Sequence, residues 1–149
     1  MISVQALSNT ILMKSFEEDV GVSPMKLQRL IYLVYKDYMH VHKKSLFYEP
    51  FEPWVHGPVL SSLYYVFKRF GAEPITRFAR GAMHDDIYVV DPSAAEITGS
   101  INKIWNTYKS YTGIQLSELT QVPTTAWFKA YKNNLRTLRD EDIRDEPAA

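Results

Sequence analysis

The four histidines are the residues of this 149-residue chain best suited to proton transfer near neutral pH or to metal binding. His40 and His42 are two positions apart in a segment with helical spacing, so their side chains point roughly 160° apart and cannot share a metal ion. His84 is followed by Asp85 and Asp86, which gives one nitrogen and two carboxylates in a turn. No second ligand set has metal spacing, so we predict no metal site.

His56 precedes Gly57 and Pro58 in a sharp turn, where an imidazole could accept or donate a proton. A hydrogen bond within the turn is the simpler interpretation. The six glycines are scattered and form no phosphate-binding loop, and no Gly-x-Ser-x-Gly elbow is present. We therefore predict a protein that is not an enzyme and binds no cofactor. A hydrolase or nucleotide-modifying enzyme built around His56 or His84 is the alternative.

Four basic residues near the end of the chain recur every three or four positions and would form one stripe on a helix: Lys129, Lys132, Arg136 and Arg139. Such a stripe could contact phosphate groups or an acidic partner. A solvated helix face is the alternative interpretation.

The segment from Pro24 to about His42 has the clearest helix signals, because Ser23 can cap it and Pro24 suits the first helical position. One apolar stripe of this helix contains Leu27, Leu30, Ile31, Val34, Tyr38 and Val41. A second stripe, which we call the Tyr/Met stripe, contains Met25, Tyr32, Tyr35 and Met39. A helix apolar on two sides is usually central in its domain. Both stripes could be core; otherwise the Tyr/Met stripe contacts a partner, as would Tyr65, which we expect to be exposed.

Apolar residues at helical spacing predict further helices over residues 3–16, 58–70, 116–119 and 123–138, and one that begins at Ser93 or Thr98 and ends near Gly113. Residues 46–55 contain Pro50 and Pro53 and should be extended. Residues 73–78 and 86–91 could pair as a short β-hairpin around a loop at 79–85. The expected fold is mainly α with a small β element (α+β), a compact helical bundle with the extended segment before the Gly-Pro helix start.

The composition is that of an ordinary globular protein, with 46% hydrophobic and 23% charged residues. The formal net charge is zero, so the chain is not built for bulk attraction to nucleic acid or to an anionic membrane. The absence of cysteine excludes disulfides and thiolate metal sites. No signal peptide and no membrane-length apolar run are recognisable, so we expect a cytoplasmic protein with no membrane partner. Residues 1–139 should form one domain, followed by a charged, flexible tail at 140–149.

Two segments in the first half of the chain resemble the Panacea domain, the SocA-like family that includes phage-associated GepA proteins. Residues 23–32 resemble its Lys-Leu-Gln-Lys-Leu-Leu-Tyr helix, and residues 51–59 resemble its segment that ends Gly-Pro-Val. Residues 116–120 and Trp127 resemble a third element nearer the C-terminus. The matching residues are Lys26, Leu27, Gln28, Leu30, Tyr32, Trp54, His56, Gly57, Pro58, Val59, Leu119, Thr120 and Trp127.

Several positions depart from the family pattern. His56 stands where the family usually has tyrosine, and Pro53 replaces a small residue. Gln121 replaces the histidine that usually follows Thr120, and Trp127 is not preceded by proline. The missing histidine counts against a catalytic role shared by the family.

The resemblance implies an antitoxin that neutralises a cognate toxin, encoded by an adjacent gene, through direct protein–protein binding. It also implies an alternative, a proteolytic adaptor that delivers a partner to an AAA+ protease. The basic stripe of Lys129, Lys132, Arg136 and Arg139 offers a second alternative, a DNA-binding autoregulator. Because the family pairs with many unrelated toxins, the motif residues should build the scaffold. Loops and exposed helix faces would then select the partner.

Overall fold

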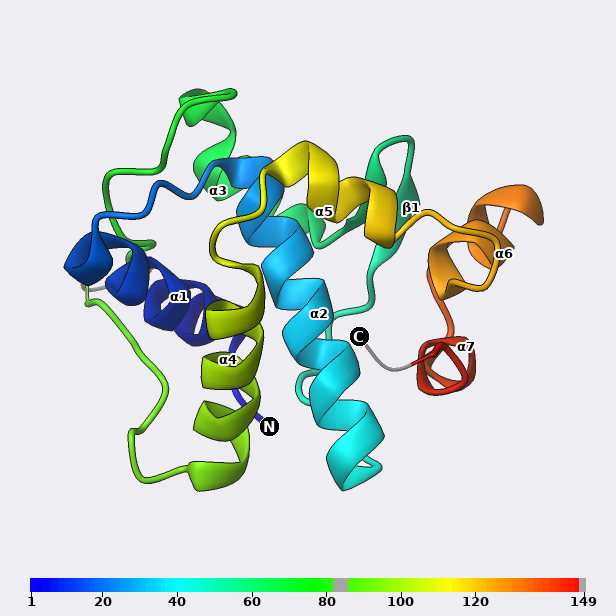
Figure 1. Ribbon diagram of the computed structural model, residues 1–149, viewed down its shortest axis with the longest axis horizontal. Coiled ribbons are helices and arrows are strands. Elements are labelled where there is room, and N and C mark those ends of the chain that lie inside the picture. The colour runs from blue at the N-terminus through cyan, green and yellow to red at the C-terminus, as the bar shows by residue number, and fades with distance from the viewer. Residues whose placement is uncertain (82–85, 148–149) are drawn as a thin grey trace.

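The computed structural model describes residues 1–81 and 86–147. Within those ranges the chain forms seven α-helices, one short 3-10 helix and one two-stranded antiparallel hairpin. The expectation of a mainly α fold with a small β element is confirmed. Figure 1 shows helix α2 in the middle of the molecule, with α1 and α4 to one side and α6 and α7 to the other.

Helix α2 (Pro24–His42) starts where the sequence predicts, because the Ser23 hydroxyl accepts a hydrogen bond from the Lys26 amide and Pro24 occupies the first turn. Every residue from Lys26 to Met39 is buried. A helix buried on all sides needs cover on every face, and its neighbours provide it. Most of both apolar stripes of α2 therefore belongs to the core, and the exceptions are Met25 and Val41 near its two ends.

Helices α1 (Val4–Glu18) and α4 (Ala95–Tyr108) cover one side of α2. The Ser3 hydroxyl caps α1 by accepting from the Ala6 amide at 3.0 Å, as its position predicts. Helix α5 (Gly113–Leu119) begins at a capping box formed by Thr112 and Gln115, three residues earlier than the apolar pattern indicates.

The hairpin does not lie where the sequence predicts it. It joins β1 (Glu52–Trp54) to β2 (Gly57–Val59). Pro53 stands opposite Pro58 in this pair, so the ladder rests on the residue pairs that flank the two prolines. Helix α3 (Ser61–Phe67) begins only after β2, so Pro58 lies in a strand and is not a helix start. A 3-10 turn, η1 (Lys68–Phe70), follows α3 and ends at Gly71.

The described parts of the expected hairpin segments, 73–78 and 86–91, contain no strand. Side chains of α1 instead form hydrogen bonds with backbone groups of Ala79, Tyr88 and Val90. The Asn9 side-chain amide donates to the Ala79 carbonyl at 2.9 Å and accepts from the Ala79 amide at 2.8 Å. Asn9 also donates to the Tyr88 carbonyl, and the Thr10 hydroxyl accepts from the Val90 amide. Residues 82–85, with His84 and most of the expected loop, lie outside the described residues.

The last predicted helix is shorter than expected. Helix α6 (Ala126–Lys132) is capped by Thr125 and ends at Lys132, and Asn134 has a left-handed φ of 54°. Arg136 and Arg139 therefore lie beyond the helix and do not continue a stripe with Lys129 and Lys132.

The chain after Leu138 is not a frayed tail, at least as far as Pro147. Helix α7 (Asp140–Arg144) buries Ile143, and Glu146 is also buried. The expectation of a flexible segment that begins at Asp140 is therefore wrong for residues 140–147. These residues pack against α2 on the side opposite α1 and α4 (Figure 1).

Candidate protein-binding surface

The side chain of Arg29 ties α2 to the hairpin. It is 2% exposed, and its Nη1 and Nη2 atoms donate to the carbonyls of Pro58 and His56, both at 2.6 Å. Its Nε donates to the Ser117 hydroxyl of α5 at 3.1 Å. All of these acceptors are neutral, and burial lowers the pKa of the guanidinium to about 10. Arg29 remains charged at neutral pH and works as a branched hydrogen-bond donor inside the protein.

The backbone of Gly57 lies directly against this guanidinium. Gly57 has a φ of 132°, which L side chains rarely adopt, and a Cβ there would stand 2.6 Å from Arg29 Nε. The glycine is therefore required twice, once for its backbone conformation and once for the close approach of the arginine.

Gln28 and Lys26 hold two further segments to α2. The Gln28 amide donates to the Leu60 carbonyl at 3.0 Å and accepts from the Leu60 amide at 2.9 Å, which fixes the entry to α3. The Lys26 ammonium donates to the Lys109 carbonyl just after α4, and burial lowers its pKa. Both side chains satisfy the backbone of distant segments and are turned away from solvent.

Two tryptophans connect the hairpin to α6. The Trp127 indole donates to the Trp54 carbonyl at 2.6 Å, and the Trp54 indole donates to Glu52 at 2.9 Å. Thr120 is buried and its hydroxyl donates to the Ser117 carbonyl, whereas Leu119 is exposed. We call the assembly of Arg29, Gln28, the hairpin and Trp127 the Arg29 corner.

An apolar groove of about 580 Å³ opens beside the Arg29 corner, between the start of α2, the hairpin and α3. Its lining includes Met25, Trp54, Val55, Leu63, Tyr64 and Tyr131. The Trp54 and Tyr64 rings lie 4.8 Å apart, and Tyr65 follows 5.3 Å from Tyr64. Val55 and Tyr65 are 63% and 65% exposed, so large apolar side chains face solvent at this site.

The structure separates the residues predicted for partner contact. Tyr32, Tyr35 and Met39 are at most 4% exposed, so this part of the Tyr/Met stripe cannot form a contact surface in the folded chain; the core alternative is correct for them. Met25 is half-buried and lines the groove. Tyr65 is exposed beside it, as predicted.

The predicted basic residues do not share one surface feature. Lys129 is half-buried and pairs with Asp142 at 3.7 Å, and the Lys132 ammonium lies 5.9 Å from the Phe128 ring. Arg136 and Arg139 are exposed in the segment between α6 and α7.

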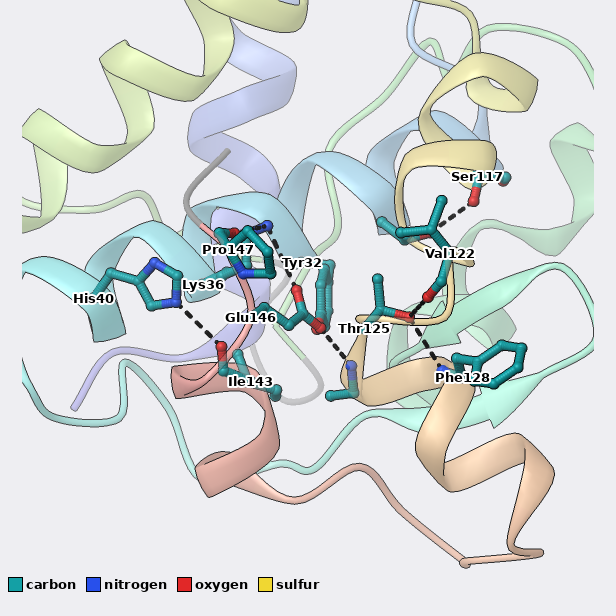
Figure 2. Close-up of polar contacts among 12 residues, drawn as sticks. Tyr32, Lys36, His40, Ser117, Val122, Thr125, Phe128, Ile143, Glu146 and Pro147 are labelled. Atoms are coloured by element: carbon teal, nitrogen blue, oxygen red, sulfur yellow. Dashed lines mark hydrogen bonds and ion pairs between the residues drawn. The ribbon is translucent and has the colours of Figure 1, made fainter.

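A second polar cluster, absent from the sequence-based expectations, closes α6 onto α2. Figure 2 shows Tyr32 and Lys36 of α2 pointing toward Glu146 near the C-terminus. The Glu146 side chain is 1% exposed, and its carboxylate accepts from the Tyr32 hydroxyl and from the Ala126 amide at 2.6 Å. Lys36 pairs with the same carboxylate at 3.4 Å. We call this set the Glu146 clamp.

The neighbouring contacts extend the clamp along α2. The Lys36 ammonium also donates to the Pro147 carbonyl at 3.2 Å, and His40 Nε2 lies 3.1 Å from the Ile143 carbonyl (Figure 2). Burial and the adjacent Glu146 carboxylate raise the pKa of Tyr32 well above its usual value. The sequence gives little indication of this cluster, because a charged segment whose one large apolar residue is Ile143 is typical of an exposed tail.

The histidines belong to no metal-binding cluster in the part of the chain that the structure describes. No cluster of three or more His, Cys, Asp or Glu side chains there could hold a metal ion. His42 lies 3.9 Å from Glu96, and His56 contributes its backbone carbonyl to Arg29. Within residues 1–81 and 86–147, no helix has the length and apolar character needed to cross a membrane.

The protein is thus a mainly helical scaffold whose central buried helix is tied by polar side chains to a Trp-x-x-Gly-Pro-Val hairpin. The family described as antitoxin SocA-like, Panacea domain, matches residues 27–128. The match covers more than half of the chain, and the protein belongs to this family, which confirms the resemblance seen in the sequence. No curated protein and no solved structure matches the chain.

Proposed function

We propose that this protein is the antitoxin of a toxin–antitoxin pair and neutralises its cognate toxin by direct binding, without catalysing a reaction. The observation that carries the proposal is the match to an antitoxin family over residues 27–128. The toxin is a protein, most simply the product of an adjacent gene, and the complex forms in the cytoplasm.

The apolar groove is the surface we propose for toxin binding. The side chains of Gln28 and Arg29 are occupied by the scaffold, so the family motif leaves few polar groups for a partner. Exposed aromatic side chains such as Tyr64 and Tyr65 are favoured anchors at protein interfaces. Met25 and Tyr65 thus keep the partner-binding role predicted for them.

Co-expression tests the proposal. The adjacent gene product, expressed alone, should stop growth, and co-expression of this protein should restore it. The two proteins should also co-purify. Absence of growth rescue together with absence of co-purification with either neighbouring gene product would contradict the proposal.

The half-life of the toxin distinguishes a blocker from an adaptor. A blocker leaves the toxin stable in the complex, whereas an adaptor shortens its half-life in cells that contain the AAA+ protease. A complex that accumulates with undegraded toxin supports neutralisation by binding alone. Salt-sensitive binding to the promoter of the pair would point to the DNA-binding alternative, through Lys132, Arg136 and Arg139.

A further inference from the structure

We infer that the apolar groove receives an amphipathic helix of the partner, whose apolar face enters the groove and whose polar face carries carboxylates beside Lys68. This inference deepens the proposed function and rests on it. Three features of the groove carry it: its apolar lining, the sign of its charged residues and the state of its backbone hydrogen-bonding groups.

The apolar lining comes from three elements. Met25 and Leu27 contribute from α2, Trp54 and Val55 from the hairpin, and Leu63 from α3, with a volume of about 580 Å³. A cavity of this size and composition has room for several apolar side chains. An amphipathic helix presents such side chains at spacings of three and four residues along one face.

The charged groups of the lining are all basic. Arg29 and Lys68 line the groove, and among the described residues no aspartate or glutamate does so. Arg29 is 2% exposed and donates to the hairpin and to Ser117, so Lys68 is the cation available to a partner. Its ammonium lies 5.5 Å from the ring of Tyr65, so this cation stands beside an exposed aromatic side chain at the α3 end of the groove. A partner that carries carboxylates there is complementary in charge.

The hairpin backbone is closed to a partner strand. The carbonyl of Trp54 accepts from Trp127, that of Val55 accepts from Gln121 at 2.7 Å, and those of His56 and Pro58 accept from Arg29. Pro53 and Pro58 have no N–H to donate. Because a docked strand needs free donors and acceptors along an edge, β-augmentation is disfavoured here. A helix satisfies its own backbone, and a groove of side chains is the surface it fits.

Two variants test the inference, with the affinity of the full-length chain for its purified toxin as the readout. Val55→Asp places a negative charge in the apolar lining, and Lys68→Glu reverses the available cation. Each should weaken binding about tenfold or more, as loss of an interface anchor does. Binding to the wild type should also weaken as salt concentration rises, because exposed charge pairs are screened.

Two matched controls lie away from the groove. Val41 is an exposed valine at the far end of α2, so Val41→Asp makes the same valine-to-aspartate change outside the groove. Lys43→Glu reverses an exposed cation just after α2 that does not line the groove. Both should bind as wild type, and all four variants should keep the wild-type circular dichroism and melting temperature.

The outcomes separate the inference from the proposed function. If the wild type neutralises and binds the toxin but both groove variants bind equally well, the groove is not the site and the inference is overturned while the proposed function stands. If only Val55→Asp weakens binding, the carboxylate part is wrong. If the toxin does not bind the wild type, both the proposed function and the inference about the groove are wrong. If Val55→Asp instead abolishes a concentration-dependent dimer without affecting toxin binding, the occupant is a second copy of this chain and the inference fails.

Charge exchange gives the sharpest support. Acidic residues on the exposed helices of the toxin are replaced by lysine one at a time. One such replacement should restore the affinity for the Lys68→Glu variant and weaken binding to the wild type. If none restores it, the cation does not meet a carboxylate on a helix of the partner.

Discussion

The guanidinium of Arg29 packs against the backbone of Gly57 so closely that a Cβ on this glycine would lie 2.6 Å from Nε and 2.8 Å from Cζ. The two residues are joined by the hydrogen bonds of Arg29 to the carbonyls on either side of Gly57, those of His56 and Pro58. This contact sets the position of the hairpin relative to α2, and the hairpin in turn forms one wall of the groove.

Replacement of Gly57 by alanine should be strongly destabilising. The new methyl group would meet the guanidinium and the backbone would be held at an unfavourable φ, so we expect a loss of about 2–4 kcal/mol in the free energy of unfolding. Gly71→Ala is the matched control, because Gly71 also has a positive φ, of 59°, but a methyl group there would meet no atom within 4 Å. It should lose about 1 kcal/mol. Urea denaturation measures both, and equal losses would show that the close approach to Arg29 has no energetic weight.

Replacement of Arg29 by methionine should also destabilise the fold. Methionine keeps much of the side-chain volume but leaves the buried carbonyl of Pro58 and the partly buried carbonyl of His56 without this donor, and we expect a loss of about 2–4 kcal/mol. Lysine should not restore stability, because a single ammonium cannot reach acceptors on both sides of Gly57 as the planar fork does. The midpoint of urea denaturation is the measurement. A methionine variant as stable as the wild type would mean that these hydrogen bonds contribute nothing net.

The Glu146 clamp should contribute a measurable part of the stability. Glu146→Ala leaves the Ala126 amide and the Lys36 ammonium without their buried partner, and we expect a loss of about 2–4 kcal/mol. Asp145→Ala is the control, because Asp145 is exposed and its ion pair among the described residues is the surface contact with Arg144 at 3.9 Å. This variant should change stability by less than about 0.5 kcal/mol. If the two variants unfold at the same denaturant concentration, the clamp is not stabilising.

Truncation after Arg139 should lower the melting temperature even though the shortened chain keeps the whole family match, which ends at residue 128. The truncation removes Ile143 and Glu146 and uncovers the hydroxyls of Tyr32 and Tyr35, which hydrogen-bond to Glu146 and Asp140. We expect a decrease of roughly 10 °C, because each kcal/mol lost shifts the midpoint of a domain of this size by about 2–4 °C. Calorimetry is the measurement; an unchanged melting temperature would mean that the segment after Arg139 is dispensable for the fold.

Alkaline pH should destabilise the protein through its buried tyrosines. Burial raises the pKa of Tyr32 and of Tyr35 above the usual value of 10.0, so these phenols stay protonated in the folded chain and ionise first in the unfolded one. Their contribution is therefore fully present below pH 10 and is lost as pH rises above it. Absorbance near 295 nm should show a group of tyrosines that ionises only on unfolding, and Tyr32→Phe should make this group smaller. Complete and reversible ionisation of all tyrosines in the folded state would contradict the prediction.

Features that depend on residues a few positions apart can be predicted from the amino-acid sequence. Ser3 and Ser23 fix the starts of α1 and α2, because a cap involves only a side chain and an amide three residues later. The apolar spacing of α2 likewise predicted a central helix, and the Gly-Pro-Val motif predicted the family. These signals are local, so they could be read without the fold.

Hydrogen bonds between distant segments become visible only in the folded chain. Asn9 and Thr10 hydrogen-bond to backbone groups of Ala79, Tyr88 and Val90, where the sequence predicted a hairpin. The hairpin of the described residues joins β1 to β2. Arg29 and Glu146 are charged residues that a sequence assigns to solvent, yet each is buried because several polar groups from distant segments converge on it. Burial of a charge becomes favourable only when all of its partners are assembled together, and no spacing along the chain records that convergence.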